Sequence, residues 1–232
     1  MSTPLSQTDV ERFLAVVQNH EDALIPEFTP PDDDDPPDFT LPAKDIVACF
    51  RGKFRRVFDV ERQGSVWERD EHWKQALSTQ KISGARFASL VRNVSLAIMR
   101  VRLEARVDVS QLVTNAKRDV ARATRIINQI DAAPPADQTR ESKALRSRSA
   151  VELGRAVALL QFAELIQQIP DESGAQVRRF SARLKALLPA RANEDLLAEL
   201  SDLAVRDENT IERAGYEVEA DESPRRSAGT RR

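Results

Sequence analysis

The chain has 232 residues and a formal net charge of −2, with 41% hydrophobic and 31% charged residues. This length and composition allow a buried core and exclude a chain that is disordered throughout. With only 7 glycines and 5% aromatic residues, the chain lacks the composition of strand-rich folds, so an all-α fold is expected. The single cysteine, Cys49, excludes an internal disulfide and fits a reducing compartment.

The first predicted helix is short and covers residues 8–20. Thr8 and Glu11 have the spacing of a capping box. An apolar stripe follows the i, i+3, i+4, i+7 rule, and its members are Val10, Phe13, Leu14 and Val17. Residues 1–20 are therefore predicted to form an N-terminal amphipathic helix that packs on the rest of the chain or on a partner, a second copy of the chain included.

Residues 21–43 are predicted to form an acidic, proline-rich linker. Residues 26–42 contain 6 of the 12 prolines and 6 acidic residues, with no basic residue. Prolines interrupt helices and sheets, and neighbouring aspartates repel one another, so an extended arm is expected. The arm contains a small duplication, at residues 27–30 and 38–42, of an acid followed by Phe, Thr and a nearby Pro. Three interpretations of the duplication are open. The copies arise by chance in a sequence of biased composition, they bind partners, or they attach the arm to the rest of the chain.

Residues 44–214 are predicted to form an irregular antiparallel bundle of about six or seven helices, because the connections are short. A flexible charged tail is expected over residues 215–232. The helices expected in chain order cover residues 44–62, 66–78, 84–107, 109–131, 142–169, 173–188 and 193–214. The pattern leaves open whether residues 84–131 form one rod or two. Residues 142–169 are apolar around most of their centre, so this helix is expected to be the innermost.

Residues 44–62 are strongly amphipathic. Phe50, Phe54 and Phe58 fall with other apolar residues within about 120° of arc, and basic residues lie outside it. Three interpretations follow. The segment is a core helix with a solvated basic back, a helix that inserts its phenylalanines into a partner's groove, or a helix that lies on an anionic membrane surface.

No sequence pattern specifies a reaction. The chain has no phosphate-binding glycine loop, nucleophile elbow, zinc-protease motif or paired-cysteine zinc motif. His72 follows Glu68 by four residues, whereas di-iron carboxylate proteins place Glu and His three apart. Cys49 has no histidine near it in the sequence, so it is interpreted as an ordinary small side chain. A protein that is not an enzyme, and that has no metal or cofactor, is therefore expected.

The first functional hypothesis is a non-catalytic, adaptor-like interaction or scaffold protein, which binds another protein through exposed helix faces and the acidic arm. Buried aromatic residues dominate interface energies. The candidate partner-binding residues are therefore Phe13, Phe28, Phe39, Phe50, Phe54 and Phe58. A homo-oligomer formed through residues 8–20 is a further expectation.

A bacterial, cytoplasmic protein is expected from the composition and the N-terminal pattern. Arginine and alanine are abundant, as in proteins encoded by GC-rich genomes. The first nine residues lack the basic-then-apolar pattern of a secretory signal, and no apolar run has the length of a membrane span.

The alternative hypothesis is a nucleic-acid-binding regulator. Residues 86–125 carry a local charge of +6. Arg118, Arg122 and Arg125 follow one helix face and are the candidate phosphate-binding residues. No helix-turn-helix pattern accompanies them. Because residues 26–42 carry −6, we also hypothesise that the arm lies across this basic face and screens it.

Overall fold

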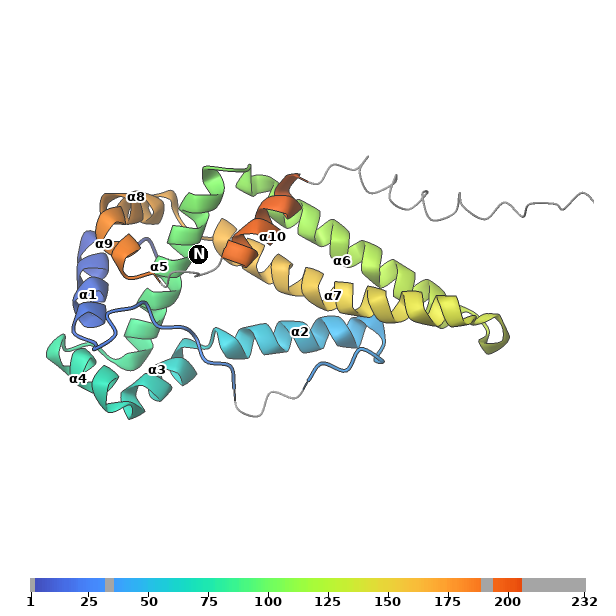
Figure 1. Ribbon diagram of the computed structural model, residues 1–232, viewed down its shortest axis with the longest axis horizontal. Helices are drawn as coiled ribbons and strands as arrows, with labels where there is room; N and C mark the ends of the chain where they lie inside the picture. Colours follow the sequence, from blue (N-terminus) through green and yellow to red (C-terminus); the bar gives the residue numbers. More distant parts are fainter. Residues whose placement is uncertain (1–2, 32–35, 189–193, 206–232) are drawn as a thin grey trace, which may run out of the picture.

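The computed structural model describes residues 3–31, 36–188 and 194–205 (Figure 1). These residues form ten α-helices and one short 3-10 helix, without a strand, so the predicted all-α class is confirmed. The helices are α1 (Gln7–Gln18), α2 (Ala43–Val57), α3 (Val60–Arg69), α4 (Glu71–Thr79), α5 (Gly84–Glu104), α6 (Val109–Ala132), α7 (Arg140–Gln167), α8 (Asp171–Arg179), α9 (Ser181–Ala186) and α10 (Glu194–Val205). The predicted tail, residues 215–232, lies outside the described residues.

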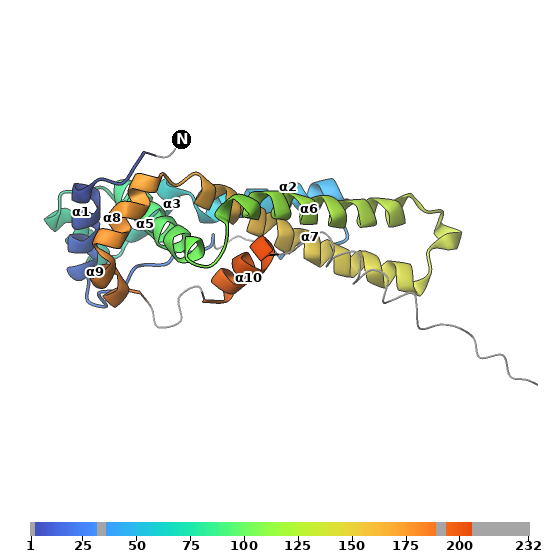
Figure 2. The ribbon, with the colours of Figure 1, turned by 90° about the horizontal axis from the view of Figure 1, so that it is seen from above.

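The helices arrange as a head and a long hairpin (Figure 1). Helices α1, α3, α4, α5, α8 and α9 gather at one end, whereas α6 and α7 run antiparallel and extend away from them, with α2 along α7. Helix α10 lies against the hairpin near the head (Figure 2). The buried Asn115 side chain holds it there, because its Nδ2 donates to the carbonyl oxygen of Leu203 at 2.8 Å.

Two apolar cores stabilise this arrangement. The larger core fills the head and takes buried side chains from α1, α5, α7 and α10. The smaller core lies between α2, α6 and α7 and consists of Ala43, Ile46, Ala123, Ile127, Ala150, Leu153 and Val157. Helix α7 contributes to both cores, which explains why its centre is apolar around most of its circumference.

Helix α1 is an integral part of the head. The Phe13 side chain has no exposed surface, and its ring stacks on that of Phe87 with 6.2 Å between the centroids. The capping box begins two residues earlier than predicted: Ser6 Oγ accepts from the N–H of Asp9, and the Asp9 carboxylate accepts from the N–H of Ser6, each at 3.1 Å. Partial burial raises the pKa of Asp9, but the hydrogen bonds from Ser6 and the nearby charge of Arg86 outweigh it, so the pKa is lowered.

Aspartate caps divide the chain into more helices than the predicted six or seven. The carboxylate of Asp59 accepts from the N–H groups that begin α3, and that of Asp70 does the same for α4. The segments predicted at 44–62 and 66–78 are therefore three helices. Asp108 caps α6 in the same way, so residues 84–131 form two helices rather than one rod.

Gly64 lies inside α3, although it falls in the gap between the helices predicted at 44–62 and 66–78. The backbones of α3 and α5 touch at this point. A Cβ atom on Gly64 would lie 2.2 Å from the backbone nitrogen of Ala85, and one on Gly84 would lie 2.3 Å from the carbonyl oxygen of Gly64. The Glu68 carboxylate also accepts from the N–H of Gly84 at 2.6 Å. Glycine is therefore required by the helix crossing and not by a turn.

The segment between α1 and α2 lies on the body of the protein. We call its described residues, 19–31 and 36–42, the strap. The N–H of Ile25 donates to the carbonyl oxygen of Leu187 at 2.9 Å, which joins the strap to the end of α9. Asp32–Asp35, which carry most of the charge of the predicted arm, lie outside the described residues.

Candidate functional site

A cavity of about 450 Å³ lies where the strap crosses between α2 and α5. We call it the phenylalanine pocket, because Phe28, Phe54, Phe58 and Phe162 line it. The wall that α5 provides consists of Val91, Arg92, Ser95, Leu96, Ile98, Met99 and Arg102. The volume falls within the range of about 300–1,000 Å³ that small-molecule sites occupy, and the mixture of apolar walls and few polar groups is also typical of them.

The aromatic wall is built from helices far apart in the sequence. Phe54 and Phe58 lie one turn apart at the end of α2, with ring centroids 4.7 Å from each other. The Phe162 ring, from α7, stands almost perpendicular to both, at 4.9 Å from Phe54 and 5.5 Å from Phe58. Such edge-to-face contacts add stability beyond the burial of apolar area, so this wall is well fixed.

The polar groups of the pocket are mainly cationic. Burial lowers the pKa of the half-buried Arg92. Within the part of the chain that the structure describes, Arg92 forms no ion pair. Arg102 lies ten residues further along α5, which corresponds to about 15 Å of helix. Glu27, the acidic residue among the described lining residues, is exposed.

The first copy of the duplicated motif is attached to α3. The Phe28 ring lies 5.5 Å from that of Phe58 and 5.8 Å from that of Trp67. The N–H of Thr29 donates to Oε1 of the buried Gln63 at 2.9 Å, and Arg62 donates to the carbonyl oxygen of Thr29. Two aromatic contacts and two backbone hydrogen bonds therefore fix this copy, which we call the first anchor.

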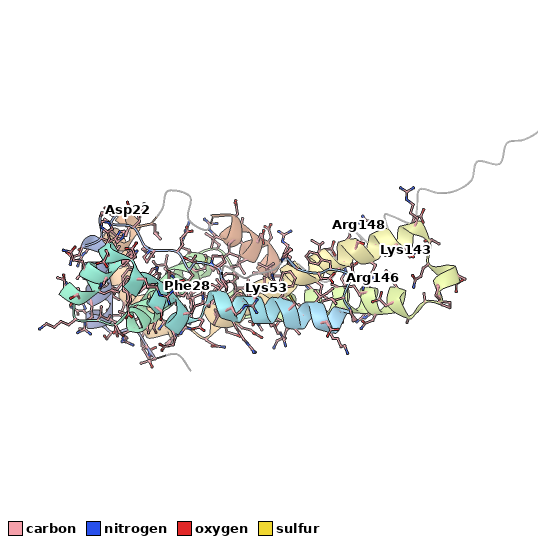
Figure 3. The ribbon with its side chains drawn as sticks, turned by 90° about the horizontal axis from the view of Figure 1, so that it is seen from below. Asp22, Phe28, Lys53, Lys143, Arg146 and Arg148 are labelled. Carbon is pink, nitrogen blue, oxygen red and sulfur yellow. The ribbon has the colours of Figure 1, made fainter. Side chains whose placement is uncertain are left out.

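The second copy is attached to α2 and α7 in a similar way. The Phe39 ring lies 5.9 Å from that of Phe50. The Arg146 guanidinium donates to the carbonyl oxygens of Phe39, Thr40 and Leu41 at 2.9 to 3.0 Å. We call this copy the second anchor. Phe28 and Arg146 mark the two anchors at separate positions along the molecule (Figure 3).

The structure places the six predicted phenylalanines in three groups. Phe13 belongs to the core of the head. Phe28, Phe54 and Phe58 meet in the phenylalanine pocket, and Phe39 packs on Phe50 at the second anchor. A partner would therefore have to displace intramolecular contacts to reach any of them.

Phe162 and Arg92 were not among the predicted residues. Phe162 lies on a helix that is apolar on most sides, so no face of it stood out. Arg92 falls on the side of its helix opposite Phe87 and Val94, so nothing in the sequence distinguished it from a solvent-exposed arginine. Arg92 lines a cavity only because the strap and α2 pack near it in the folded chain.

The predicted arginine row lies on α6, and its surroundings are partly acidic. Arg122 lines a second cavity of about 270 Å³, between α6, α7 and α10. Arg155 also lines it and pairs with Glu199 at 2.9 Å. The acidic lining residues are Asp119, Glu152, Glu199 and Asp202. The negative charge of these carboxylates opposes the approach of a phosphate to Arg122. Arg125 does not line this cavity and is exposed.

The histidines and the cysteine lie in ordinary surroundings. The His20 ring stacks on that of Trp73 at 3.9 Å, and His72 Nδ1 lies 3.6 Å from a Glu21 carboxylate oxygen. Cys49 is partly buried on α2. In the described ranges, no three His, Cys, Asp or Glu side chains come together in a way that would hold a metal ion.

Comparisons of the chain with models of protein families, with curated proteins and with solved structures find no match. None of the helices in the described residues has both the length and the apolar character needed to cross a membrane. The phenylalanine pocket and the two anchors are therefore the features on which a functional proposal depends.

The second anchor is expected to loosen in acid. Hydrogen bonds from the hydroxyl and the N–H of Thr40, together with the charge of Arg146, lower the pKa of Asp38. Because the pKa is lower in the folded chain than in the unfolded chain, the stabilisation is complete above about pH 4 and is lost as the pH falls through the lowered value. The amide signal of Thr40, followed by NMR during an acid titration, should report this loss. In an Asp38→Asn variant the signal should no longer titrate with Asp38, and an unchanged titration would contradict the assignment.

Proposed function

We propose that the protein is a non-catalytic, adaptor-like helical interaction protein. Its binding site is the surface that the first anchor covers, and its partner carries a segment of the same chemistry, an acid followed by Phe and Thr. The observation that supports this proposal is the duplication itself. Two copies of one short motif attach at two different places, each through a phenylalanine on an aromatic ring and an arginine on the threonine carbonyl.

The contacts of the first anchor are those of a bound peptide. The Phe28 ring provides apolar area, and the hydrogen bonds at Thr29 fix the direction of the backbone. Neither depends on the covalent link to α1, so a segment from another protein can make the same contacts. The strap competes with it at an effective concentration on the order of millimolar, because its linkers are short. The partner must therefore bind well enough to displace the strap.

A second contact surface is available on the exposed face of α7. Leu145 and Val151 are 43% and 53% exposed, although both are large apolar residues on a helix that α2 and α6 otherwise cover. Arg148, which is labelled in Figure 3, is exposed. It lies three residues from each of them in the sequence, which is about one turn of helix. In this proposal the bundle works in the cytoplasm as a scaffold, with the strap as its replaceable arm and the face of α7 as an additional contact.

Nucleic-acid binding through Arg118, Arg122 and Arg125 stays a prediction with less support. The carboxylates around Arg122 argue against a phosphate site there. The screening hypothesis depends on Asp32–Asp35, which lie outside the described residues, so it also stays untested.

The proposal predicts that weakening the first anchor makes its site available to a peptide. A dye-labelled peptide of residues 24–31 should bind the full-length Phe28→Ala variant several-fold more tightly than the wild-type chain, because the internal competitor is weaker. Fluorescence polarisation measures the difference. The Phe39→Ala variant is the matched control, since it loosens the other anchor and should bind this peptide no better than the wild type.

Two further measurements sharpen the result. The same peptide with alanine in place of its phenylalanine should not bind, because the aromatic contact is missing. Equal affinity of the wild type and the Phe28→Ala variant for the peptide would contradict the proposal. A concentration-dependent dimer of the Phe28→Ala variant, seen by light scattering, would instead indicate that two copies exchange their straps.

A further inference from the structure

Side chains from six parts of the chain line the phenylalanine pocket. The strap, α2, α5 and α7 provide most of the lining, and Leu188 and Leu196 complete it. The pocket is open to solvent on one side, and its volume of about 450 Å³ and mainly apolar walls are those of a small-molecule site.

The shape and chemistry of the walls favour a flexible apolar chain. Phe54, Phe58 and Phe162 present ring edges and faces on one side. The wall that α5 provides presents aliphatic side chains and Met99, whose unbranched thioether adapts to irregular apolar surfaces. No acidic side chain is buried among the described lining residues, so a cationic group would find no counter-charge inside.

Arg92 supplies the position for a head group. A half-buried guanidinium without an ion pair is unfavourable, because part of its hydration is lost and no protein carboxylate replaces it. A carboxylate fits the planar guanidinium with two parallel hydrogen bonds, which are stronger than bonds between neutral groups. Ser95, one turn further along α5, places a hydroxyl group on the same side of the helix.

We propose that the phenylalanine pocket binds a single-chain amphiphile with a carboxylate head group, of the fatty-acid class, with the chain against Phe54, Phe58 and Phe162 and the carboxylate at Arg92. Phe28 and Phe58 belong both to this pocket and to the proposed partner site. The two proposals are tested with different probes and different substitutions, so the failure of one can be distinguished from the failure of the other. The lowered pKa of Arg92, caused by its burial, agrees with a guanidinium that lacks a counter-ion in the unliganded chain.

Isothermal titration calorimetry on the full-length wild-type chain tests the proposal. The probes are dodecanoate, dodecanol and dodecyltrimethylammonium, each below its micelle concentration, so that only the head group differs. Dodecanoate should bind with one site per chain and at least about tenfold more tightly than dodecanol, as expected for a charge-assisted hydrogen bond. Dodecyltrimethylammonium should bind more weakly than both.

Substitutions assign the head group to its position. Arg92→Gln should weaken dodecanoate binding at least about tenfold and leave dodecanol binding unchanged, because only the charged contact is removed. Arg106→Gln is the matched control: Arg106 is exposed just beyond α5 and does not line the pocket, so both affinities should be unchanged. Circular dichroism verifies that the variants keep their helix content.

Two results would overturn the proposal. If the wild-type chain binds neither dodecanoate nor dodecanol, the pocket is not a site for an acyl chain. If dodecanoate and dodecanol bind equally and Arg92→Gln changes neither affinity, the pocket does not recognise a carboxylate. Both measurements are independent of the peptide experiment, which reports only on the first anchor.

Discussion

Replacing Gly64 with alanine is expected to lower the free energy of unfolding by about 3 kcal/mol or more, because the added methyl group collides with backbone that cannot rotate away. The new Cβ atom would lie 2.2 Å from the nitrogen of Ala85 and 2.5 Å from the carbonyl carbon of Gly84. Helices α3 and α5 would have to separate along their whole contact. Urea unfolding, followed through the fluorescence of the buried Trp67 and Trp73, measures the loss.

Gly52 provides the matched control for this substitution. It also lies inside a helix, α2, but a Cβ atom there would meet only the end of the Arg56 side chain, at 3.8 Å. Gly52→Ala should therefore stabilise the chain by about 0.5–1 kcal/mol, through helix propensity alone. If Gly64→Ala were as stable as Gly52→Ala, the close crossing of α3 and α5 would be wrong.

Replacing Arg146 with alanine is expected to cost about 2–3 kcal/mol and to release the second anchor. Five hydrogen bonds would be lost, three to the carbonyl oxygens of Phe39, Thr40 and Leu41 and two to the Asp131 carboxylate. The bonds to Asp131 also raise the pKa of Arg146, so the guanidinium is held in its charged form. Urea unfolding measures the cost, and limited proteolysis should show faster cleavage between α1 and α2 than in the wild type.

Arg148 is the control for this second substitution. It lies on the same helix, two residues further along, and is exposed. Arg148→Ala should change the free energy of unfolding by less than about 0.5 kcal/mol and leave the cleavage rate unchanged. An Arg146→Ala variant that resists cleavage as well as Arg148→Ala does would show that Arg146 does not hold the strap.

Much of the fold was predictable from local pattern. The apolar stripe of α1 and the broad apolar surface of α7 both indicated their positions, because burial imposes the helical period on the sequence. The helix boundaries around Asp59 and Gly64 were less predictable. At Asp59 the apolar stripe continues across the boundary, so the stripe hides the cap that begins α3. Glycine is needed at position 64 because its backbone touches that of Gly84, which is twenty residues away in the sequence and therefore outside any local pattern.

The candidate site was predictable only in part. Phe50, Phe54 and Phe58 share one arc of their helix, which suggested one surface, yet Phe50 contacts the second anchor while the other two form the pocket. Phe54 and Phe58 differ from Phe50 because Phe162, from α7, packs against both of them and completes the pocket. Contacts between segments a hundred residues apart follow from packing, and the sequence alone contains no signal that pairs them.

The strap is fastened to the body before residue 32 and again after residue 35. The covalent link between the two sides is therefore not what keeps α1 in place, since Val10 and Phe13 are fully buried and Ile25 is bonded to Leu187. Residues 3–31 can be regarded as a small ligand bound to a larger receptor that begins at residue 36. Proteins of this construction are those that can be reassembled from two separate pieces, with affinity taking the place of the peptide bond.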